Sequence, residues 1–179
     1  MKLGFVSMPV TGHLNPMTAL ARKLQSRGNE VAFIGLPDDE PILRAANLNF
    51  VPFCEQEYPV GSVAKGYASL AKLHGLHVVE HSAREIHPGR CKSALEHLPE
   101  KLAETGVQAL VIDTVHFFVE LVPMRLGMPY GFKSRRGRQL RINNLRLLRG
   151  ELIGTKRQFS PVHHRALQSD RCKSESYSG

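Results

Sequence analysis

The chain has 179 residues, of which 42% are apolar, a size and composition that suit one globular domain with a buried core and leave little room for two. Its 15 glycines and 11 prolines exclude a collagen-like chain, and every apolar run falls short of the roughly 18–20 residues that cross a bilayer. The formal net charge of +8 comes from the end of the chain, because residues 1–130 hold 12 basic and 13 acidic side chains, whereas residues 131–179 hold 12 and 3.

A strand, a loop and a helix open the chain. Residues 2–7 (KLGFVS) are apolar and β-prone, and a loop follows up to Asn15. Asn15 and Pro16 predict the helix start, because Asn caps free amide groups and Pro tolerates the first helical position. Apolar residues then recur at helical spacing until Gly28, which predicts the end of the helix. A second strand at residues 31–35 (VAFIG) completes a β-α-β unit.

The same alternation continues to residue 130. Further strands are predicted at residues 49–53 and 109–113 and from residue 128 onward. Helical segments are predicted at residues 37–47, in pieces over 60–85 because of Gly61, Gly66 and Gly75, and at 91–105 and 116–126. This order of elements indicates the α/β class, with a Rossmann-like, doubly wound parallel sheet.

The composition changes after Tyr130. Residues 131–179 are rich in Arg, Lys, Ser, Gln and His, and residues 140–153 could form one basic helix. We therefore divide the chain into a domain at 1–130 and a basic tail at 131–179, which is either disordered or translated out of frame. The tail has no motif that reads nucleic acid, so a nucleic-acid partner is not expected despite its charge, although electrostatic binding of nucleic acid or anionic membrane is the alternative.

The first loop carries the candidate chemistry. Residues 8–16 (MPVTGHLNP) lack the glycine patterns that hold a dinucleotide or a nucleoside triphosphate, which argues against a nucleotide-dependent oxidoreductase. The loop instead places His13 just ahead of a helix. The positive end of a helix disfavours an imidazolium, so we expect His13 to stay neutral near pH 7, as a general base must.

Topology supplies a partner for this imidazole. In the strand order 3-2-1-4, the first and fourth strands are neighbours, and ligands bind beyond their carboxyl ends. His13 follows the first strand and Asp113 ends the fourth, so we expect the two side chains to face one crevice. Asp113 would then accept one ring N–H and fix the tautomer. The alternatives are that His13 is an ordinary polar loop residue and that Asp113 caps the helix at His116.

Two segments resemble a known family. Residues 4–35 (GFVSMPVTGHLNPMTALARKLQSRGNEVAFIG) closely resemble the opening of UDP-dependent glycosyltransferases of the GT-B fold, especially bacterial relatives of macrolide and zeaxanthin glucosyltransferases. The family's G-H-x-N-P loop stands at residues 12–16. Residues 109–130 (ALVIDTVHFFVELVPMRLGMPY) resemble its strand, Asp, helix and Gly-x-Pro segment. The resemblance covers about residues 1–130, the N-terminal half of a GT-B fold.

The resemblance implies sugar transfer from a UDP-sugar co-substrate to a hydroxyl of a hydrophobic small-molecule acceptor, with His13 as base and Asp113 as its acidic partner. The acceptor cleft would lie in this half, and the sugar nucleotide would bind mainly to a second domain, so no donor-binding residue or other cofactor is expected here. The isolated chain should be inactive. The residues expected at the acceptor are Gly12, Asn15, Phe53 and Tyr67, with Tyr58 and Leu73 as further candidates.

Other interpretations remain open at this stage. The chain could be a non-catalytic remnant or a binding module that keeps the acceptor cleft. Three histidines at helical spacing, His74, His77 and His81, could in principle bind zinc, although they do not form H-E-x-x-H, and a solvated or cleft-lining face is favoured. An odd number of widely spaced cysteines indicates a reducing cytoplasm, and the sequence holds three: Cys54, Cys91 and Cys172.

Overall fold

Six strands form one sheet in the computed structural model, which describes residues 1–133 and 140–143. The strand order is β3-β2-β1-β4-β5-β6, with β1 to β5 parallel and β6 antiparallel to β5. The strands are β1 (Lys2–Val6), β2 (Glu30–Gly35), β3 (Asn49–Pro52), β4 (Ala109–Asp113), β5 (Tyr130–Lys133) and β6 (Leu140–Asn143). The predicted doubly wound parallel sheet is confirmed, including the adjacency of the first and fourth strands.

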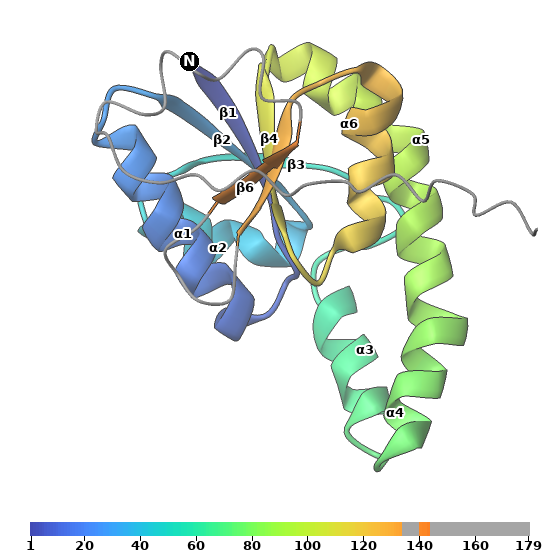
Figure 1. Ribbon diagram of the computed structural model, residues 1–179. Coiled ribbons are helices and arrows are strands. Elements are labelled where there is room, and N and C mark those ends of the chain that lie inside the picture. Colours follow the sequence, from blue (N-terminus) through green and yellow to red (C-terminus); the bar gives the residue numbers. More distant parts are fainter. Residues whose placement is uncertain (134–139, 144–179) are drawn as a thin grey trace, which may run out of the picture.

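Helices cover both faces of this sheet. They are α1 (Thr11–Gln25), α2 (Glu40–Ala45), α3 (Ser62–Leu70), α4 (Leu76–His81), α5 (His87–Thr105) and α6 (Leu121–Leu126). Figure 1 shows α1 and α2 on one face and α5 and α6 on the other. Within the described residues, no helix combines the length and apolarity that a membrane span requires.

Alternating side chains of the strands build two cores. Phe5 and Phe33 point to the α1 face, where their rings stack with centroids 5.9 Å apart. The neighbouring residues Val6 and Ile34 point to the α5 face, because successive side chains of a strand lie on opposite sides of the sheet. Gly4 permits close packing on this second face, since a Cβ atom there would lie 2.9 Å from side-chain atoms of both Val107 and Leu110.

The first helix begins earlier than the sequence predicts. It starts at Thr11, so Pro16 lies inside it, and Asn15 is exposed and caps nothing. The backbone N–H groups of His13 and Leu14 both bond to the carbonyl of Val10, at 2.8 Å, and form the first turn. The Leu14 side chain is buried against the sheet, which favours extending the helix over this turn. The prediction that Asn15-Pro16 starts the helix is therefore wrong, and His13 lies within the first helical turn.

The sheet also continues beyond residue 130. Strand β5 opens as predicted, and β6 pairs with its free edge, where Tyr130 faces Asn143 and Lys133 faces Leu140. The predicted basic helix at residues 140–153 is wrong for residues 140–143, because the unpaired backbone groups of an edge strand offer a partner for an extended segment. The rest of that helix, and the other predictions for the tail, lie outside the described residues.

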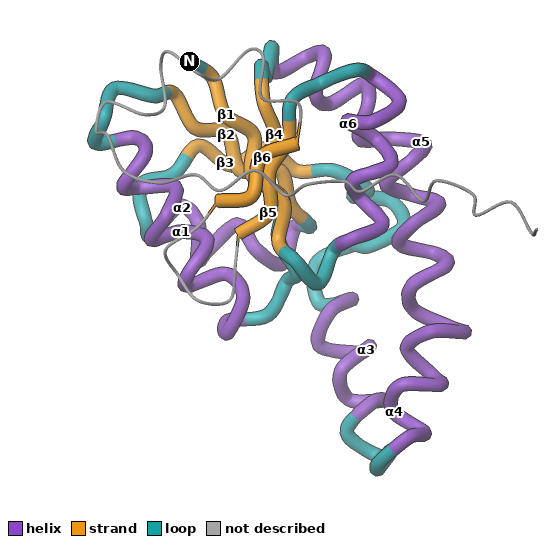
Figure 2. Tube along the Cα trace, viewed as in Figure 1, coloured by secondary structure: helices purple, strands orange, loops and turns teal. Residues whose placement is uncertain are grey.

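A helical hairpin extends past the carboxyl end of the sheet. Figure 2 shows α3 and α4 running beside the first part of α5, and a π-helical turn, Ser82–Ile86, joins α4 to α5. Asp38 fixes the start of α3, because its carboxylate accepts hydrogen bonds from the backbone N–H groups of Gly61 and Val63. The predicted interruptions at Gly61 and Gly75 fall at helix starts, whereas α3 runs through Gly66. This hairpin forms one wall of the site described next.

Candidate functional site

The site begins where β1 and β4 end side by side. Val6 pairs with Ile112 in the parallel register, so the next residues, Ser7 and Asp113, lie at the same edge of the sheet. The chain then turns into α1, whose first turn carries His13. The crossover from β1 to α1 thus brings an imidazole to a carboxylate that is 100 residues away along the chain.

His13 and Asp113 are in direct contact. Nδ1 of His13 lies 2.8 Å from Oδ2 of Asp113, with 34% of the His13 side chain and 6% of the Asp113 side chain exposed. The hydroxyl of Ser7 donates to the same oxygen at 3.1 Å, and the backbone N–H of Val115 donates to Oδ1 at 3.4 Å. With the carboxylate as acceptor, Nδ1 carries the proton, and the lone pair of Nε2 is left for another partner.

Asp113 does not serve as the cap of the following helix. The 3₁₀ turn Phe117–Glu120 begins after His116, which is its N-cap residue, and no side chain caps it. Instead the backbone N–H of His116 bonds to the Asp113 carbonyl at 2.9 Å, and the carboxylate turns back toward Ser7 and His13. The alternative role of Asp113 as a helix cap is therefore wrong.

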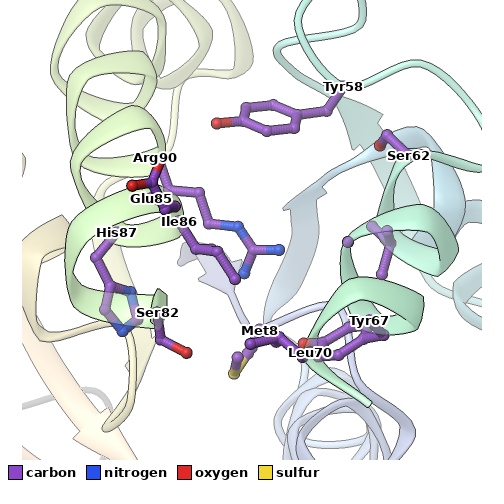
Figure 3. A pocket seen from close by; sticks show the side chains of 12 residues that line it. Met8, Tyr58, Ser62, Tyr67, Leu70, Ser82, Glu85, Ile86, His87 and Arg90 are labelled. Carbon is purple, nitrogen blue, oxygen red and sulfur yellow. The ribbon is translucent and has the colours of Figure 1, made fainter. Parts of the chain in front are cut away.

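A cavity of about 180 Å³ lies in the same domain, and its lining includes Met8 but neither His13 nor Asp113. It starts at Met8, the residue after Ser7, and lies between α3 and the segment from Ser82 to Arg90 (Figure 3). The lining is mostly apolar, as in most small-molecule sites, with a few polar groups turned inward. The residues are Met8, Tyr58, Ser62, Val63, Gly66, Tyr67, Leu70, Ser82, Glu85, Ile86, His87 and Arg90.

The structure separates the residues that were predicted to contact an acceptor. Tyr67 and Tyr58 line this cavity. Phe53 is buried and lines a smaller neighbouring cavity of about 30 Å³, which Tyr58 also borders. Gly12 and Asn15 are exposed on α1 and line neither cavity. Leu73, half-buried beyond α3, lines neither cavity either. Contact with an acceptor remains a prediction for all of them.

Comparison with known proteins tests the fold. No protein-family model matches the sequence, and no curated protein matches it. Solved structures do match. Spinosyn rhamnosyltransferase SpnG is similar at 21% sequence identity with a TM-score of 0.54, and the match covers 74% of this chain and 34% of the SpnG chain. The Streptomyces sp. SF2575 glycosyltransferase SsfS6 matches at 19% identity and TM-score 0.54, over 73% and 38%. Glycosyltransferase VinC, solved with dTDP, matches at 15% identity and TM-score 0.53, over 73% and 33%.

The chain shares its α/β fold with part of each of these glycosyltransferases. It spans little more than a third of the length of the solved enzymes it matches. This agrees with the fold that the G-H-x-N-P segment predicted. The activity and substrates of a whole glycosyltransferase are taken up below as a proposal.

The domain also holds residues near the site that the sequence did not indicate. Ser7 ends the first predicted strand, so its place at the carboxyl edge could have been inferred from the strand alone. Arg90 and His87 come from α5, and His116 follows Asp113 by three residues. Nothing in the sequence places the start of α5 opposite α3, because that contact depends on the helical hairpin.

Several buried polar atoms of residues that line the two cavities have no well-formed hydrogen bond within the described residues. They are Oγ of Ser62, the hydroxyl of Tyr67, Nδ1 of His87, Nε of Arg90 and both ring nitrogens of His116. Burial, reinforced by the positive charge of Arg90, lowers the pKa of His116 to about 4. His116 therefore stays neutral at physiological pH and adds no cation to the site.

Possible metal ligands come together away from the three histidines that the sequence analysis considered, for which a solvated or cleft-lining face was favoured. Among the described residues, the three histidines at 74, 77 and 81 form no ligand group. The group that does form is Cys54, Glu57 and His97, whose ligand atoms lie within 4.8 Å of one another. His97 already contacts Glu57 at 2.8 Å, and burial raises the pKa of the Cys54 thiol to about 12. The group is therefore explained as an ion pair beside a protonated thiol.

His116 should make stability depend on pH. Because the pKa of His116 in the folded state lies below the ordinary 6.5, the stability that its neutral form contributes to the fold is fully present above pH 6.5. This stability is lost as the pH falls toward 4. The free energy of unfolding, measured in urea at pH 7 and at pH 4.5, should fall between these pH values by up to about 3 kcal/mol less in His116→Leu than in the wild type.

Two references isolate the effect of His116. Burial raises the pKa of Asp39 to about 7. The stability that protonated Asp39 contributes to the fold is therefore present at low pH and is lost as the pH rises through that value, which is the opposite of the dependence expected for His116. The pH dependence of unfolding is therefore compared between each variant and the wild type, because the wild-type curve alone would combine the two effects. His77→Leu, at an exposed position, should follow the wild type. An unchanged pH dependence in His116→Leu would contradict a neutral, buried imidazole.

Proposed function

We propose that this chain is the acceptor-binding half of a glycosyltransferase that uses a nucleoside-diphosphate sugar, with His13 as the base that activates the acceptor hydroxyl. The observation that supports this most directly is the 2.8 Å contact between His13 and Asp113 at the carboxyl edge of the sheet, from which the chain continues through Met8 of the cavity wall. A partly exposed imidazole whose inner nitrogen donates to a buried carboxylate is arranged to take up a proton on its outer nitrogen.

The proposed reaction is one inverting displacement. Nε2 of His13 takes the proton from the acceptor hydroxyl as its oxygen attacks the anomeric carbon of the sugar. A new carbon–oxygen bond forms, the bond between that carbon and the diphosphate breaks, and the nucleoside diphosphate leaves with the electron pair. The carboxylate of Asp113 stabilises the imidazolium that forms on His13, and the hydroxyl of Ser7 keeps this carboxylate in place.

The identity of the donor is part of the proposal. The resemblance in sequence favours a UDP-sugar. Two matching structures, those of SsfS6 and VinC, were solved with thymidine diphosphate, so a dTDP-sugar is an equal candidate for the co-substrate. The acceptor is proposed to be a largely apolar small molecule, since apolar side chains make up most of the cavity wall. A cytoplasmic location fits the free thiols of Cys54 and Cys91.

A donor-binding domain should be needed for turnover. We expect the 179-residue chain alone to show little or no transfer from UDP-glucose or dTDP-glucose. A protein in which residues 1–133 precede the donor-binding domain of SsfS6 should form a glycoside with one of these donors, detected by mass spectrometry on a panel of hydroxylated aromatic acceptors. Turnover by the chain alone would contradict the need for a donor domain.

The alternative is a binding module that keeps the cavity without catalysis. In that case the fused protein would bind acceptors but form no glycoside with either donor, while SsfS6 itself, as the positive control, remains active. That result would overturn the proposed catalytic function.

A further inference from the structure

Arg90 points into the cavity from the first turn of α5. In Figure 3 its guanidinium lies at the centre of the cavity, between Tyr58 and the face of α3 that carries Tyr67. The Arg90 side chain is partly buried, because α3 covers it from the opposite side. A cation in this place meets whatever molecule fills the cavity.

This cation has no ion-pair partner in the part of the chain that the structure describes. No carboxylate oxygen of these residues lies within 4.0 Å of the Arg90 guanidinium, and its Nε makes no hydrogen bond. Arg84, six residues earlier, does pair with Glu80, at 3.2 Å. A partly buried guanidinium without a partner is costly, and an anion that brings acceptor oxygens removes this cost.

The nearby carboxyl groups do not fill this role. Asp39 feels the charge of Arg90, but its Oδ2 accepts a hydrogen bond from the backbone N–H of Leu36 at 3.1 Å. Burial raises the pKa of Asp39 to about 7, so this group is partly protonated at neutral pH. Glu85 also lines the cavity, but its side chain is exposed and its charge is screened by water.

Hydrogen-bond donors surround the guanidinium. The hydroxyl of Ser62 is buried and unpaired, Nδ1 of His87 is unpaired as well, and the buried hydroxyl of Tyr67 has no partner other than Arg90 itself. Burial raises the pKa of Tyr67 above its ordinary value, although the charge of Arg90 and a hydrogen bond from it oppose this shift, so the phenol keeps its proton for donation at neutral pH. Nearby apolar side chains such as Met8 and Leu70 complete the wall. The combination suits a molecule with an apolar body and one group of acceptor oxygens.

We infer that the acceptor carries a carboxylate, which binds Arg90 through paired hydrogen bonds and accepts another from Tyr67, while its apolar body lies against Met8 and Leu70. This inference rests on the proposed function, since it names the class of the acceptor. The fork of a guanidinium matches the two oxygens of a carboxylate. A phosphate of the donor is the other source of such oxygens, but the largely apolar wall fits it less well.

The test uses the 179-residue chain and 6-hydroxy-2-naphthoate, an aromatic acid with a hydroxyl group. The chain has no tryptophan, so the fluorescence anisotropy of the naphthoate reports binding without interference. The acid should bind at least about tenfold more tightly than its methyl ester, because only the acid forms charge-assisted hydrogen bonds. Arg90→Gln should abolish this preference while leaving the binding of the ester unchanged.

Three further variants control for folding and for charge. Arg90→Lys keeps the charge but loses the fork, so it should retain only part of the preference. Tyr67→Phe should weaken the acid about threefold. Arg84→Gln removes a charge of the same sign from an exposed position and should bind like the wild type.

Other outcomes would overturn the inference. Equal affinity for acid and ester would do so, as would no binding of either. An equal loss of the preference in Arg84→Gln would assign it to net charge and not to the site. Displacement of the acid by pyrophosphate at matching affinity would assign Arg90 to a phosphate. None of these results requires catalysis, whereas the proposed function is tested separately, by whether the fused enzyme forms a glycoside.

Discussion

His13→Ala should lower kcat for glycosyl transfer by about 10²- to 10⁴-fold in the fused enzyme with its donor-binding domain, the range that a positioned general base contributes. The reason is that the acceptor hydroxyl is a poor nucleophile until its proton leaves, and Nε2 of His13 is the group proposed to take it. The KM for the acceptor should change little, because the cavity residues that would bind it stay in place. The measurement is initial rates at saturating donor and acceptor, at pH 8.

His77→Ala is the matched control for this prediction. His77 is exposed on α4, on the same domain but away from the cavity, and its removal should leave kcat unchanged. Binding of 6-hydroxy-2-naphthoate to His13→Ala should also match the wild type, which would show that the variant is folded. A variant that lacks the imidazole and yet turns over at the wild-type rate would remove His13 from the mechanism.

Asp113→Asn should lower kcat for glycosyl transfer by a similar factor, about 10²- to 10⁴-fold, although the imidazole of His13 is still present. An amide at this position can donate to Nδ1 of His13, so the ring would carry its proton on Nε2 and could no longer accept one from the acceptor. Asp113→Ala should in addition destabilise the fold by about 1–3 kcal/mol in urea, because the buried hydroxyl of Ser7 loses its 3.1 Å acceptor and keeps only the weaker 3.4 Å contact with the Met8 carbonyl.

Ser7→Ala tests whether Asp113 acts through its position. It removes one hydrogen bond to Oδ2 and leaves the charge, so kcat should fall only about three- to tenfold, with little loss of stability. If Asp113→Asn kept the wild-type kcat while Asp113→Ala unfolded the chain, the carboxylate would have a purely structural role.

The contact between His13 and Asp113 could be predicted from the sequence because it depends only on strand order. Once the first and fourth strands are neighbours, the residues at their carboxyl ends must share one edge of a parallel sheet. The apolar runs at residues 2–7 and 109–113 are short and clear, so both strands could be located to within a residue of where the structure has them. The catalytic role of the pair is still a prediction.

Local signals failed where tertiary contacts outweighed them. Asn15 and Pro16 are strong helix-start residues, yet burial of Leu14 against the sheet extends the helix over the preceding turn. Residues 140–143 look helical because of their composition, but pairing with the free edge of β5 makes them a strand. In both cases the deciding partner is distant in the sequence.

The cavity was the part least accessible to prediction. Tyr67 was expected near an acceptor from a resemblance to other enzymes, whereas Arg90, which faces it, was not singled out at all. Their proximity depends on how Asp38 docks the start of α3 and how a π-helical turn redirects the chain into α5. Neither feature has a signature in hydrophobic spacing.

The most direct test of the account is the tautomer of His13. Nitrogen-15 NMR of the 179-residue chain at pH 8, with the His13 signals assigned by their loss in His13→Ala, should show a proton on Nδ1 and none on Nε2. In Asp113→Asn the proton should move to Nε2. A wild-type His13 that carries its proton on Nε2 would show that Asp113 does not hold the ring for catalysis and would contradict the proposed mechanism.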